Sequence, residues 1–285
     1  MRTLVHLSDI HFGRIDAAII EPLIALVADL KPNIVTVSGD LTQRARSYQF
    51  QEARAFLDRL PKPQIVVPGN HDIPLHNVFT RFFQPLDKYR RFITNDLQPF
   101  FADEEIAVLG VNTARSLTFK GGRVNEKQVA LIREKLCPLG NDVVKIVVTH
   151  HPFDLPEGFD ESELVGRAKM AMKTLADCGA DVFLAGHLHV TYTGHTAKRY
   201  KIGDHSALVV QAGTATSTRG RGEANSFNVI RVEYPNIAVE RFVWQPADSV
   251  FISNQIEKFQ QASNGWTRVT DDNLVNQEKI NAETI

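Results

Sequence analysis

The sequence predicts an α/β fold, because two kinds of apolar periodicity alternate along its first two thirds. Short apolar runs rich in β-branched residues are typical of buried strands, and segments with apolar residues three and four apart are typical of helices. After residue 186 apolar runs follow one another without helices, which favours antiparallel strands. Of the 285 residues, 43% are hydrophobic, so a sizeable core can be buried without disulfides.

The expected elements follow in chain order. Strands before residue 186 are expected at 3–8, 34–38, 64–67, 106–111, 145–149 and 182–185. Helices are expected at 16–30, 47–60, 126–136 and 167–178. Such alternation predicts largely parallel strands with helices on the faces of a sheet. Later strands are expected at 189–201, 207–214, 227–232 and 238–243, forming a second sheet packed on the first.

Two segments stand apart from this pattern. Residues 73–96 are rich in Phe, Arg and Tyr and follow a candidate site residue, which indicates either a helical lid or a satellite of the core. Beyond residue 245 the chain turns polar. We therefore expect one main domain at 1–245 and an extension at 246–285, as a packed arm, a partner contact or a partly disordered tail.

Charge and cysteine content limit the partners and the compartment. Lys plus Arg is 32 and Asp plus Glu is 33, a formal charge of -1, so bulk charge would not hold the protein to nucleic acid or to an anionic membrane. No apolar run approaches the roughly 20 residues that span a bilayer, and the first residues lack a signal-peptide core. Cys137 and Cys178 are expected to be buried thiols in a reducing compartment. A cytoplasmic protein is the expectation.

Polar side chains follow five of the expected strands, at the point where each strand ends. The carboxyl ends of parallel strands share one rim of the sheet, where ligands bind in open α/β folds. A single motif of this kind is common by chance, but five in this order at strand ends are not. The motifs are Asp9-Ile10-His11, Gly39-Asp40, Gly69-Asn70-His71-Asp72, His150-His151-Pro152 and Gly186-His187-Leu188-His189.

The chemistry of these residues is that of a transition-metal site. Imidazole, carboxylate and amide donors without a thiolate suit Zn, Mn or Fe. In the D-x-H and H-x-H spacings, alternate side chains of an extended segment point to the same side, although the two rings of H-x-H can also divide between neighbouring ions. Glycine before Asp40, Asn70 and His187 relieves crowding where the backbone turns beneath the site.

Other polar residues are weaker candidates. Asn112 and Arg115 follow the fourth strand and could line the same rim. The run 213–222 carries Arg219 and Arg221, which suit phosphate recognition but are more often part of a solvated hairpin, so neither is assigned as catalytic. A structural role is expected for the remaining histidines, His6, His76, His195 and His205.

At the five motifs the sequence resembles the calcineurin-like metallophosphoesterases, over roughly residues 1–245. The resemblance implies a four-layer αββα sandwich, in which two mixed β-sheets are flanked by helices. Within the family the sequence is similar to bacterial class III cyclic-nucleotide phosphodiesterases. That similarity rests on 6–11, on Asp40-Leu41-Thr42 and on 149–152, which glycerophosphodiester hydrolases share.

The resemblance also implies a set of ligands for two divalent or trivalent transition-metal ions (Mn, Fe or Zn). One ion would be held by Asp9, His11, Asp40 and His189. The other would be held by Asp40, Asn70, His150 and His187, with Asp40 bridging. His71 would interact with the phosphate or the leaving group, and His151 would lie in the second shell or face the substrate.

The expected activity is hydrolysis of small phosphodiesters, including 3′,5′-cyclic nucleotides such as cAMP, by a hydroxide that bridges the metals. Asp40 and His71 are the expected catalytic residues, and Asp72 would orient His71 or cap the next turn. The alternatives are a glycerophosphodiester or other phosphoester hydrolase, or a non-catalytic scaffold of the same fold. The expected partner is a small phosphodiester rather than nucleic acid, and a homo-oligomer is left open.

Overall fold

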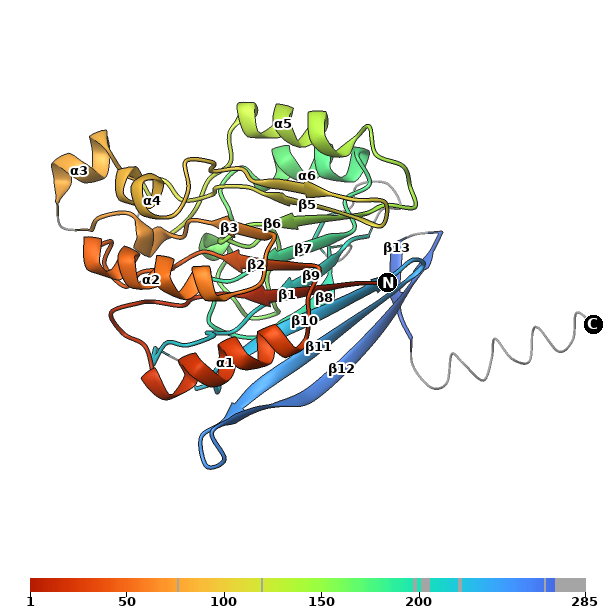
Figure 1. The fold of residues 1–285 in the computed structure, drawn as a ribbon. Helices are drawn as coiled ribbons and strands as arrows, with labels where there is room; N and C mark the ends of the chain where they lie inside the picture. Colours follow the sequence, from red (N-terminus) through yellow and green to blue (C-terminus); the bar gives the residue numbers. More distant parts are fainter. Residues whose placement is uncertain are drawn as a thin grey trace, which may run out of the picture.

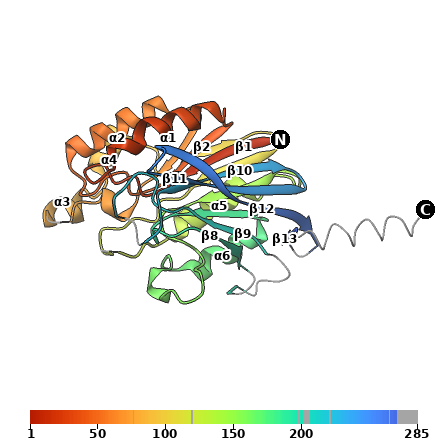
Figure 2. The ribbon, with the colours of Figure 1, turned by 90° about the horizontal axis from the view of Figure 1, so that it is seen from below.

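The computed structural model describes residues 1–75, 77–118, 120–196, 199–200, 206–219, 222–263 and 265–269. Two mixed β-sheets pack face to face, with helices on both outer surfaces (Figures 1 and 2). The predicted four-layer sandwich is confirmed. His76 and His205, for which a structural role was expected, lie outside the described residues.

The first sheet has seven strands in the order β13-β12-β11-β10-β1-β2-β3. Three parallel strands form one side: β1 (Arg2–Leu7), β2 (Ile34–Ser38) and β3 (Gln64–Val67). The other side is antiparallel: β10 (Ser226–Glu233), β11 (Asn236–Gln245), β12 (Val250–Ala262) and β13 (Gly265–Arg268). The helices α1 (Ala17–Asp29) and α2 (Ser47–Arg59) cover its outer face.

The second sheet has six strands in the order β4-β5-β6-β7-β9-β8. Its parallel centre is β5 (Ile106–Gly110), β6 (Val144–Val148), β7 (Val182–Ala185) and β9 (Leu208–Gln211). Antiparallel edges are β4 (Phe100–Ala102) and β8 (Tyr192–His195). The helices α5 (Glu126–Leu136) and α6 (Ala168–Asp177) cover this sheet.

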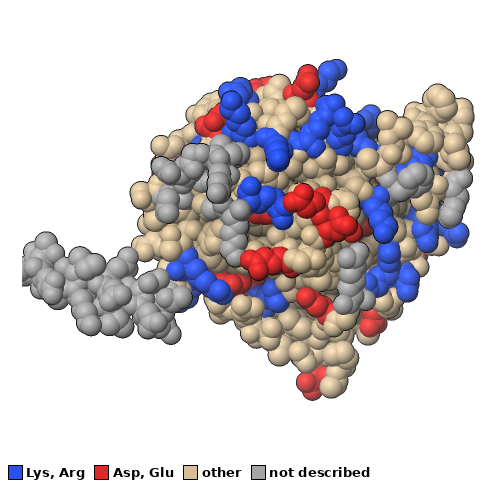
Figure 3. Space-filling model, turned by 180° about the vertical axis from the view of Figure 1, so that it is seen from behind, with Lys and Arg blue, Asp and Glu red and all other residues tan. Residues whose placement is uncertain are grey.

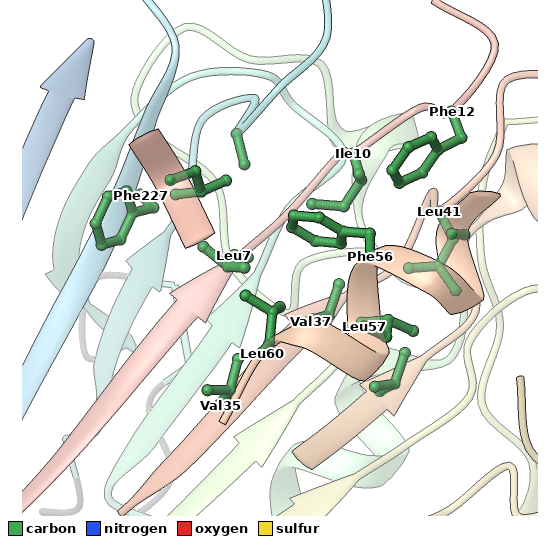
Figure 4. Close-up of a cluster of buried hydrophobic side chains, with 14 of the residues drawn as sticks. Leu7, Ile10, Phe12, Val35, Val37, Leu41, Phe56, Leu57, Leu60 and Phe227 are labelled. Carbon is green, nitrogen blue, oxygen red and sulfur yellow. The ribbon is translucent and has the colours of Figure 1, made fainter. Parts of the chain in front are cut away.

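Packing on both faces explains why the central strands read as continuous apolar runs. Every residue of β2, β5 and β6 is buried, because one side of each strand faces the other sheet and the other side faces helices. In Figure 4, Phe56 and Leu57 of α2 lie over Val35 and Val37 of β2. Burial at this density fixes the strand ends, and therefore the residues that follow them, relative to one another.

The strands after residue 186 depart from the sequence expectation. The expected second sheet made of these strands is wrong, because β10 pairs with the free edge of β1 and so extends the first sheet. Only β8 and β9 join the other sheet, where β9 lies parallel to β7. The expected strand 189–201 shortens to β8, and its end lies outside the described residues.

The segment after residue 245 adds two strands to the first sheet. β12 pairs with β11 along ten residue positions, and β13 pairs with β12. This pairing favours the packed-arm alternative for the described part of the extension. Residues 270–285 lie outside the described residues.

The segment 73–96 contains two short helices, α3 (Val78–Phe83) and α4 (Asp87–Phe92). The hydroxyl of Tyr89 in α4 is buried and donates to the carbonyl of Val66 over 2.9 Å. α4 is therefore part of the core. α3 instead exposes large apolar side chains, with Phe79 66% and Phe83 73% accessible.

Cys137 and Cys178 form a disulfide, so the expectation of free thiols is wrong. Each cysteine is the residue that directly follows its helix, α5 or α6, and these helices lie side by side on the second sheet. The pairing depends on this packing, because the cysteines are 41 residues apart in sequence. The cysteines thus give no support for a reducing compartment. Within the described ranges, no helix combines the length and apolarity needed to cross a membrane.

His6 in β1 should make the stability of the protein depend on pH. The ring is fully buried, 2.9 Å from the Ser38 hydroxyl, and burial lowers its pKa from 6.5 to about 3. Below pH 6.5 the unfolded chain takes up a proton that the folded chain refuses, so the free energy of unfolding falls on acidification, by about 1.4 kcal/mol per pH unit.

The variant His6→Gln retains a hydrogen-bonding group without a titrating one. Urea unfolding at pH 7.5 and 5.0 should show wild type losing about 2 kcal/mol more than this variant. Parallel stability curves for the two proteins would contradict the assignment of a neutral buried His6.

Candidate active site

The five motifs converge at one end of the sandwich, where β1, β2, β3, β6 and β7 finish. Asp9 and His11 follow β1, Asp40 follows β2, and Asn70 lies in a 3₁₀ turn (Asn70–Asp72) after β3. The second sheet contributes its motifs from the ends of β6 and β7. A hydrogen bond of 3.0 Å from the backbone N–H of His187 to Asp9 Oδ2 joins the two sheets at the site.

The backbone is strained at five of the seven proposed metal ligands. Positive φ angles occur at Asp9 (51°), His11 (56°), Asp40 (51°), His187 (72°) and His189 (57°). Such angles cost free energy in residues with a Cβ and persist only where the surrounding structure imposes them. Five of the nine non-glycine residues with positive φ in the described chain belong to the candidate motifs, which indicates a site that the fold holds in a fixed geometry.

Glycine is required beside the site because the loops approach so closely. A Cβ on Gly69 would collide with the Asp40 carboxylate, and one on Gly186 would collide with the Ser8 hydroxyl and the Asp9 carboxylate. Gly39 has a φ of +87°, which a side chain would resist. These contacts agree with the reason that the sequence suggested for glycine before Asp40, Asn70 and His187.

One group of potential ligands consists of Asp9, His11, Asp40 and His189, all buried, with ligand atoms within 4.8 Å of one another. His189 Nε2 lies 3.3 Å from Asp9 Oδ1, and His11 Nε2 lies 3.7 Å from Asp40 Oδ2. The ring nitrogens of His11 and His189 are 3.4 Å apart. This is the set that the resemblance implies for the first metal.

A second group lies beside the first and meets it at Asp40. His150 Nε2 is 3.4 Å from Asp40 Oδ2 and 3.0 Å from Asn70 Oδ1. Ring nitrogens of His150, His151 and His187 lie within 4.8 Å of one another. The structure thus brings together Asp40, Asn70, His150 and His187, which the resemblance implies for the second metal, and adds His151 as a neighbour.

The donor set fits transition-metal cations. Among the described residues, Asp9 Oδ1 and His11 Nδ1 are buried without a hydrogen-bond partner, a costly arrangement unless a ligand completes it. Two buried carboxylates and several imidazoles without a thiolate match Zn, Mn or Fe. These two groups are the candidate ligands of the two metals that the resemblance implies.

Hydrogen bonds outside the two groups orient the imidazole rings. His150 Nδ1 donates to the Ser38 carbonyl over 2.8 Å, which leaves Nε2 facing Asp40. His189 Nδ1 lies 3.2 Å from the Arg219 carbonyl, and His187 Nε2 lies 2.8 Å from a carboxylate oxygen of Glu163. Because a carbonyl or carboxylate accepts, Nδ1 of His189 and Nε2 of His187 carry protons, and the other nitrogen of each ring keeps a lone pair for a metal. In His150 a metal would take the place of the proton on Nε2.

Electrostatic interactions favour the ionised forms of the acidic and histidine side chains at the site, although these side chains are buried. Burial opposes ionisation of Asp9 and Asp40, but neighbouring histidines hold the pKa of both carboxyls below the ordinary value. Burial likewise opposes protonation of His150, and the carboxylates of Asp40 and Asp9 raise its pKa to about 9. The cluster of acids therefore attracts positive charge, as a cation site requires.

His71 lies beside the ligand groups rather than in them. Its backbone N–H donates to Asp40 Oδ1 over 2.8 Å, and Nδ1 lies 2.9 Å from the Gln43 carbonyl. Nδ1 therefore carries a proton, and Nε2 accepts from Arg219 Nη1 over 2.9 Å. Burial lowers the pKa of His71, so the ring is neutral in this arrangement.

Asp72 connects two of the loops. Its carboxylate accepts from the backbone N–H groups of Leu41, Thr42 and Gly69 over 2.9 to 3.2 Å. Burial and the nearby Asp40 carboxylate raise the pKa of Asp72 to about 6. The contacts fit a clamp between the loops after β2 and β3, rather than a partner for the His71 ring, whose nitrogens contact Gln43 and Arg219.

His151 is fully buried, and both of its ring nitrogens are engaged by the protein. Nδ1 lies 2.8 Å from the Thr113 hydroxyl, and Nε2 lies 2.7 Å from the Lys120 carbonyl. Of the two roles left open by the sequence, this geometry favours the second shell. His151 ties the loop at 113–120 to the site.

Replacing His151 by Phe should loosen that loop without removing a metal ligand. We expect full metal content and an increase in KM of about tenfold with a smaller change in kcat, since loss of an outer-shell partner typically costs about 10–100-fold. Metal analysis and steady-state kinetics on one phosphodiester would measure both. A variant that loses one metal equivalent would instead make His151 a ligand.

A cavity of about 270 Å³ opens beside His71 and shows residues that the sequence did not assign. Arg219 was weighed as a phosphate contact but not assigned, and Arg44 and Lys120 gave no recognisable signal. Glu163, which contacts His187 outside this cavity, gave none either. The candidate Arg115 does not line this cavity, because its guanidinium binds the Asn112 carbonyl and Gln128. The cavity is lined by Gln43, Arg44, Asn70, His71, Ile73, Leu75, Lys120 and Arg219.

The four-layer fold and a rim of imidazole and carboxylate donors define a class of metal-centred phosphoester hydrolases. The chain belongs to the calcineurin-like phosphoesterase family, whose model matches residues 2–191.

Two curated relatives are similar over part of the chain. A glycerophosphodiester phosphodiesterase, GpdQ, of Enterobacter lignolyticus is 27% identical over 165 residues, which is 53% of this chain and 58% of that protein. A probable glycerophosphodiester phosphodiesterase of Arcobacter nitrofigilis is 24% identical over 143 residues, 50% of each chain. The matches therefore span about half the length of these relatives.

Solved structures show the same fold at low identity. A dimetal phosphatase from Danio rerio superposes with a TM-score of 0.62 at 14% identity, covering 84% of this chain and 95% of that one. The purple acid phosphatase PPD1 of yellow lupin gives a TM-score of 0.64 at 14% identity, covering 88% and 52% respectively. At this identity the likeness concerns the fold alone.

Proposed function

We propose that the protein is a dinuclear metal-dependent phosphodiesterase that acts on small phosphodiesters. The observation that carries this proposal is the pair of ligand groups sharing Asp40, with His71 and a cationic cavity directly beside them. Asp9, His11, Asp40 and His189 would hold one ion. Asp40, Asn70, His150 and His187 would hold the other.

When bound, two such ions would lower the pKa of water and neutralise charge on the phosphoryl oxygens. The chain's own residues supply orientation and donors. Asp40 receives the His71 N–H and so fixes that ring at the cavity wall. Arg219 Nη1, which contacts His71 Nε2, can donate to a phosphoryl or departing oxygen. This pair would stabilise the leaving group.

Glycerophosphodiesters are the first substrates that we propose. The support is that both similar relatives are named as glycerophosphodiester phosphodiesterases. Cyclic AMP, which the resemblance to class III cyclic-nucleotide phosphodiesterases suggested, stands second. On the face seen in Figure 3, basic side chains gather along the top and one side, around a central group of acidic ones. The formal charge of -1 agrees with a small substrate rather than a nucleic acid.

The segment 73–96 is proposed as a wall over this cavity. Ile73 and Leu75 line the cavity, and the buried Arg81 of α3 donates to the carbonyls of Pro74 and Thr118. Arg81 thus holds α3 against the two loops that border the site.

A substrate panel on metal-loaded protein tests the proposal. Glycerophosphoethanolamine, cyclic AMP and bis(p-nitrophenyl) phosphate would be compared in Mn²⁺, with Fe²⁺ and Zn²⁺ as alternatives. We expect a higher kcat/KM for the glycerophosphodiester than for cyclic AMP. Preference for cyclic AMP would reverse the order of substrates. Lack of any hydrolysis, together with absence of bound metal, would favour the non-catalytic scaffold.

A further inference from the structure

Among the residues that the structure describes, the lining of the cavity beside His71 includes no carboxylate and three cationic side chains: Arg44, Lys120 and Arg219. Within the described parts of the chain, no ion pair joins any of the three to an acidic side chain. The chain as a whole carries a formal charge of -1, so this local excess is not a consequence of overall composition.

The positive charges lie close enough to oppose one another. Burial lowers the pKa of the Arg219 guanidinium; the carboxylate of Asp40 raises it, and the charges of Arg14 and Arg44 lower it. Like charges placed together cost free energy, and an anionic ligand would offset that cost.

Backbone carbonyls at or next to two of these cationic residues contact the site histidines His71 and His151. Arg44 follows Gln43, whose carbonyl lies 2.9 Å from His71 Nδ1. The carbonyl of Lys120 lies 2.7 Å from His151 Nε2. The chain therefore carries both side chains to the cavity at defined points, and both residues are exposed.

Arg219 already has a role at the scissile phosphoryl group through its contact with His71, and a simple phosphodiester carries only one negative charge. The positive charges of Arg44 and Lys120 are thus more than the single negative charge of such a diester requires. We propose that the substrate carries a second anionic group, a carboxylate or a phosphate, which Arg44 and Lys120 bind while the scissile phosphodiester lies at the metal centre. This inference rests on the proposed function and specifies its substrate class.

Two matched diesters test this inference, because glycerophosphoserine differs from glycerophosphoethanolamine only by a carboxylate. In Mn²⁺-loaded protein we expect kcat/KM to be about tenfold higher for the serine compound, mainly through KM, since exposed cations form modest charge-assisted contacts. The double variant Arg44→Gln/Lys120→Gln should bring the ratio close to one. Arg46→Gln, an exposed arginine outside the cavity, is the matched control and should keep the ratio.

Calorimetric binding gives a readout that does not depend on turnover. With Mn²⁺-loaded protein, 3-phosphoglycerate should bind about tenfold more tightly than glycerol 3-phosphate, and the double variant should lose this difference. Equal affinities in wild type, or a preference that survives in the double variant, would overturn the inference. Absence of hydrolysis of every diester would count against the proposed function alone, because the binding comparison still reports on the subsite.

Discussion

Replacing Asp40 by alanine is expected to abolish metal binding and phosphodiester hydrolysis together. Asp40 is the residue at which the two ligand groups meet, with Oδ2 3.7 Å from His11 Nε2 and 3.4 Å from His150 Nε2. It also accepts the His71 backbone N–H over 2.8 Å. Loss of an outer-shell partner already costs about 10–100-fold, so loss of the shared carboxylate should lower kcat by at least about 10³-fold.

Two further variants separate metal loss from misfolding. Asp40→Asn keeps an oxygen that can accept the His71 N–H but removes the negative charge, so it should fold and still bind less than one metal equivalent. Asp16→Asn at the start of α1 is a matched control, because Asn also serves as an N-cap. Metal content by mass spectrometry and folding by circular dichroism are the measurements. Two bound metals and full kcat in Asp40→Asn would remove Asp40 from the centre.

Replacing His71 by alanine is expected to leave metal content intact and to lower kcat. The ring lies outside both ligand groups, between the Gln43 carbonyl and Arg219. Its loss would remove the group that positions Arg219, which is the proposed donor to the departing oxygen. For an alkoxide leaving group we expect a fall in kcat of about 10²–10³-fold, the usual cost of losing one preorganised donor.

The leaving group supplies the internal control for His71. p-Nitrophenolate departs with little assistance, so the loss in His71→Ala should be much smaller with bis(p-nitrophenyl) phosphate than with a glycerophosphodiester. His195→Ala, on the edge strand β8, is a comparison variant away from the site. A loss of equal size on both substrates would exclude leaving-group assistance, and a loss of metal would make His71 a ligand.

The parts of the site that could be predicted from the sequence are those in which a short motif directly follows its own strand. Each motif directly follows a buried strand, and the ends of β1, β2, β3, β6 and β7 meet at one end of the sandwich. Residue types with imidazole and carboxylate donors at those points were enough to predict a metal site. The strands themselves could be predicted from the apolar pattern of buried segments alone.

Contacts between distant residues could not be predicted in this way. Arg219 meets His71 across 148 positions, and His187 meets Glu163 from a loop without any motif. Both nitrogens of His151 are used by Thr113 and Lys120, which a two-histidine motif does not reveal. Whether a polar side chain faces the site or ties a loop depends on neighbours that only the folded chain supplies.

The sequence by itself determined the fold class, the positions of the central strands and the five groups of polar residues at their ends. These follow from patterns within a few residues: apolar periodicity, glycine before a turn and donor type. The tertiary structure alone decided that β10 to β13 extend the first sheet, that Cys137 pairs with Cys178, and that three cations surround the cavity beside His71. Each depends on which sheet edge or helix end lies beside another, and that is set by packing of the whole chain.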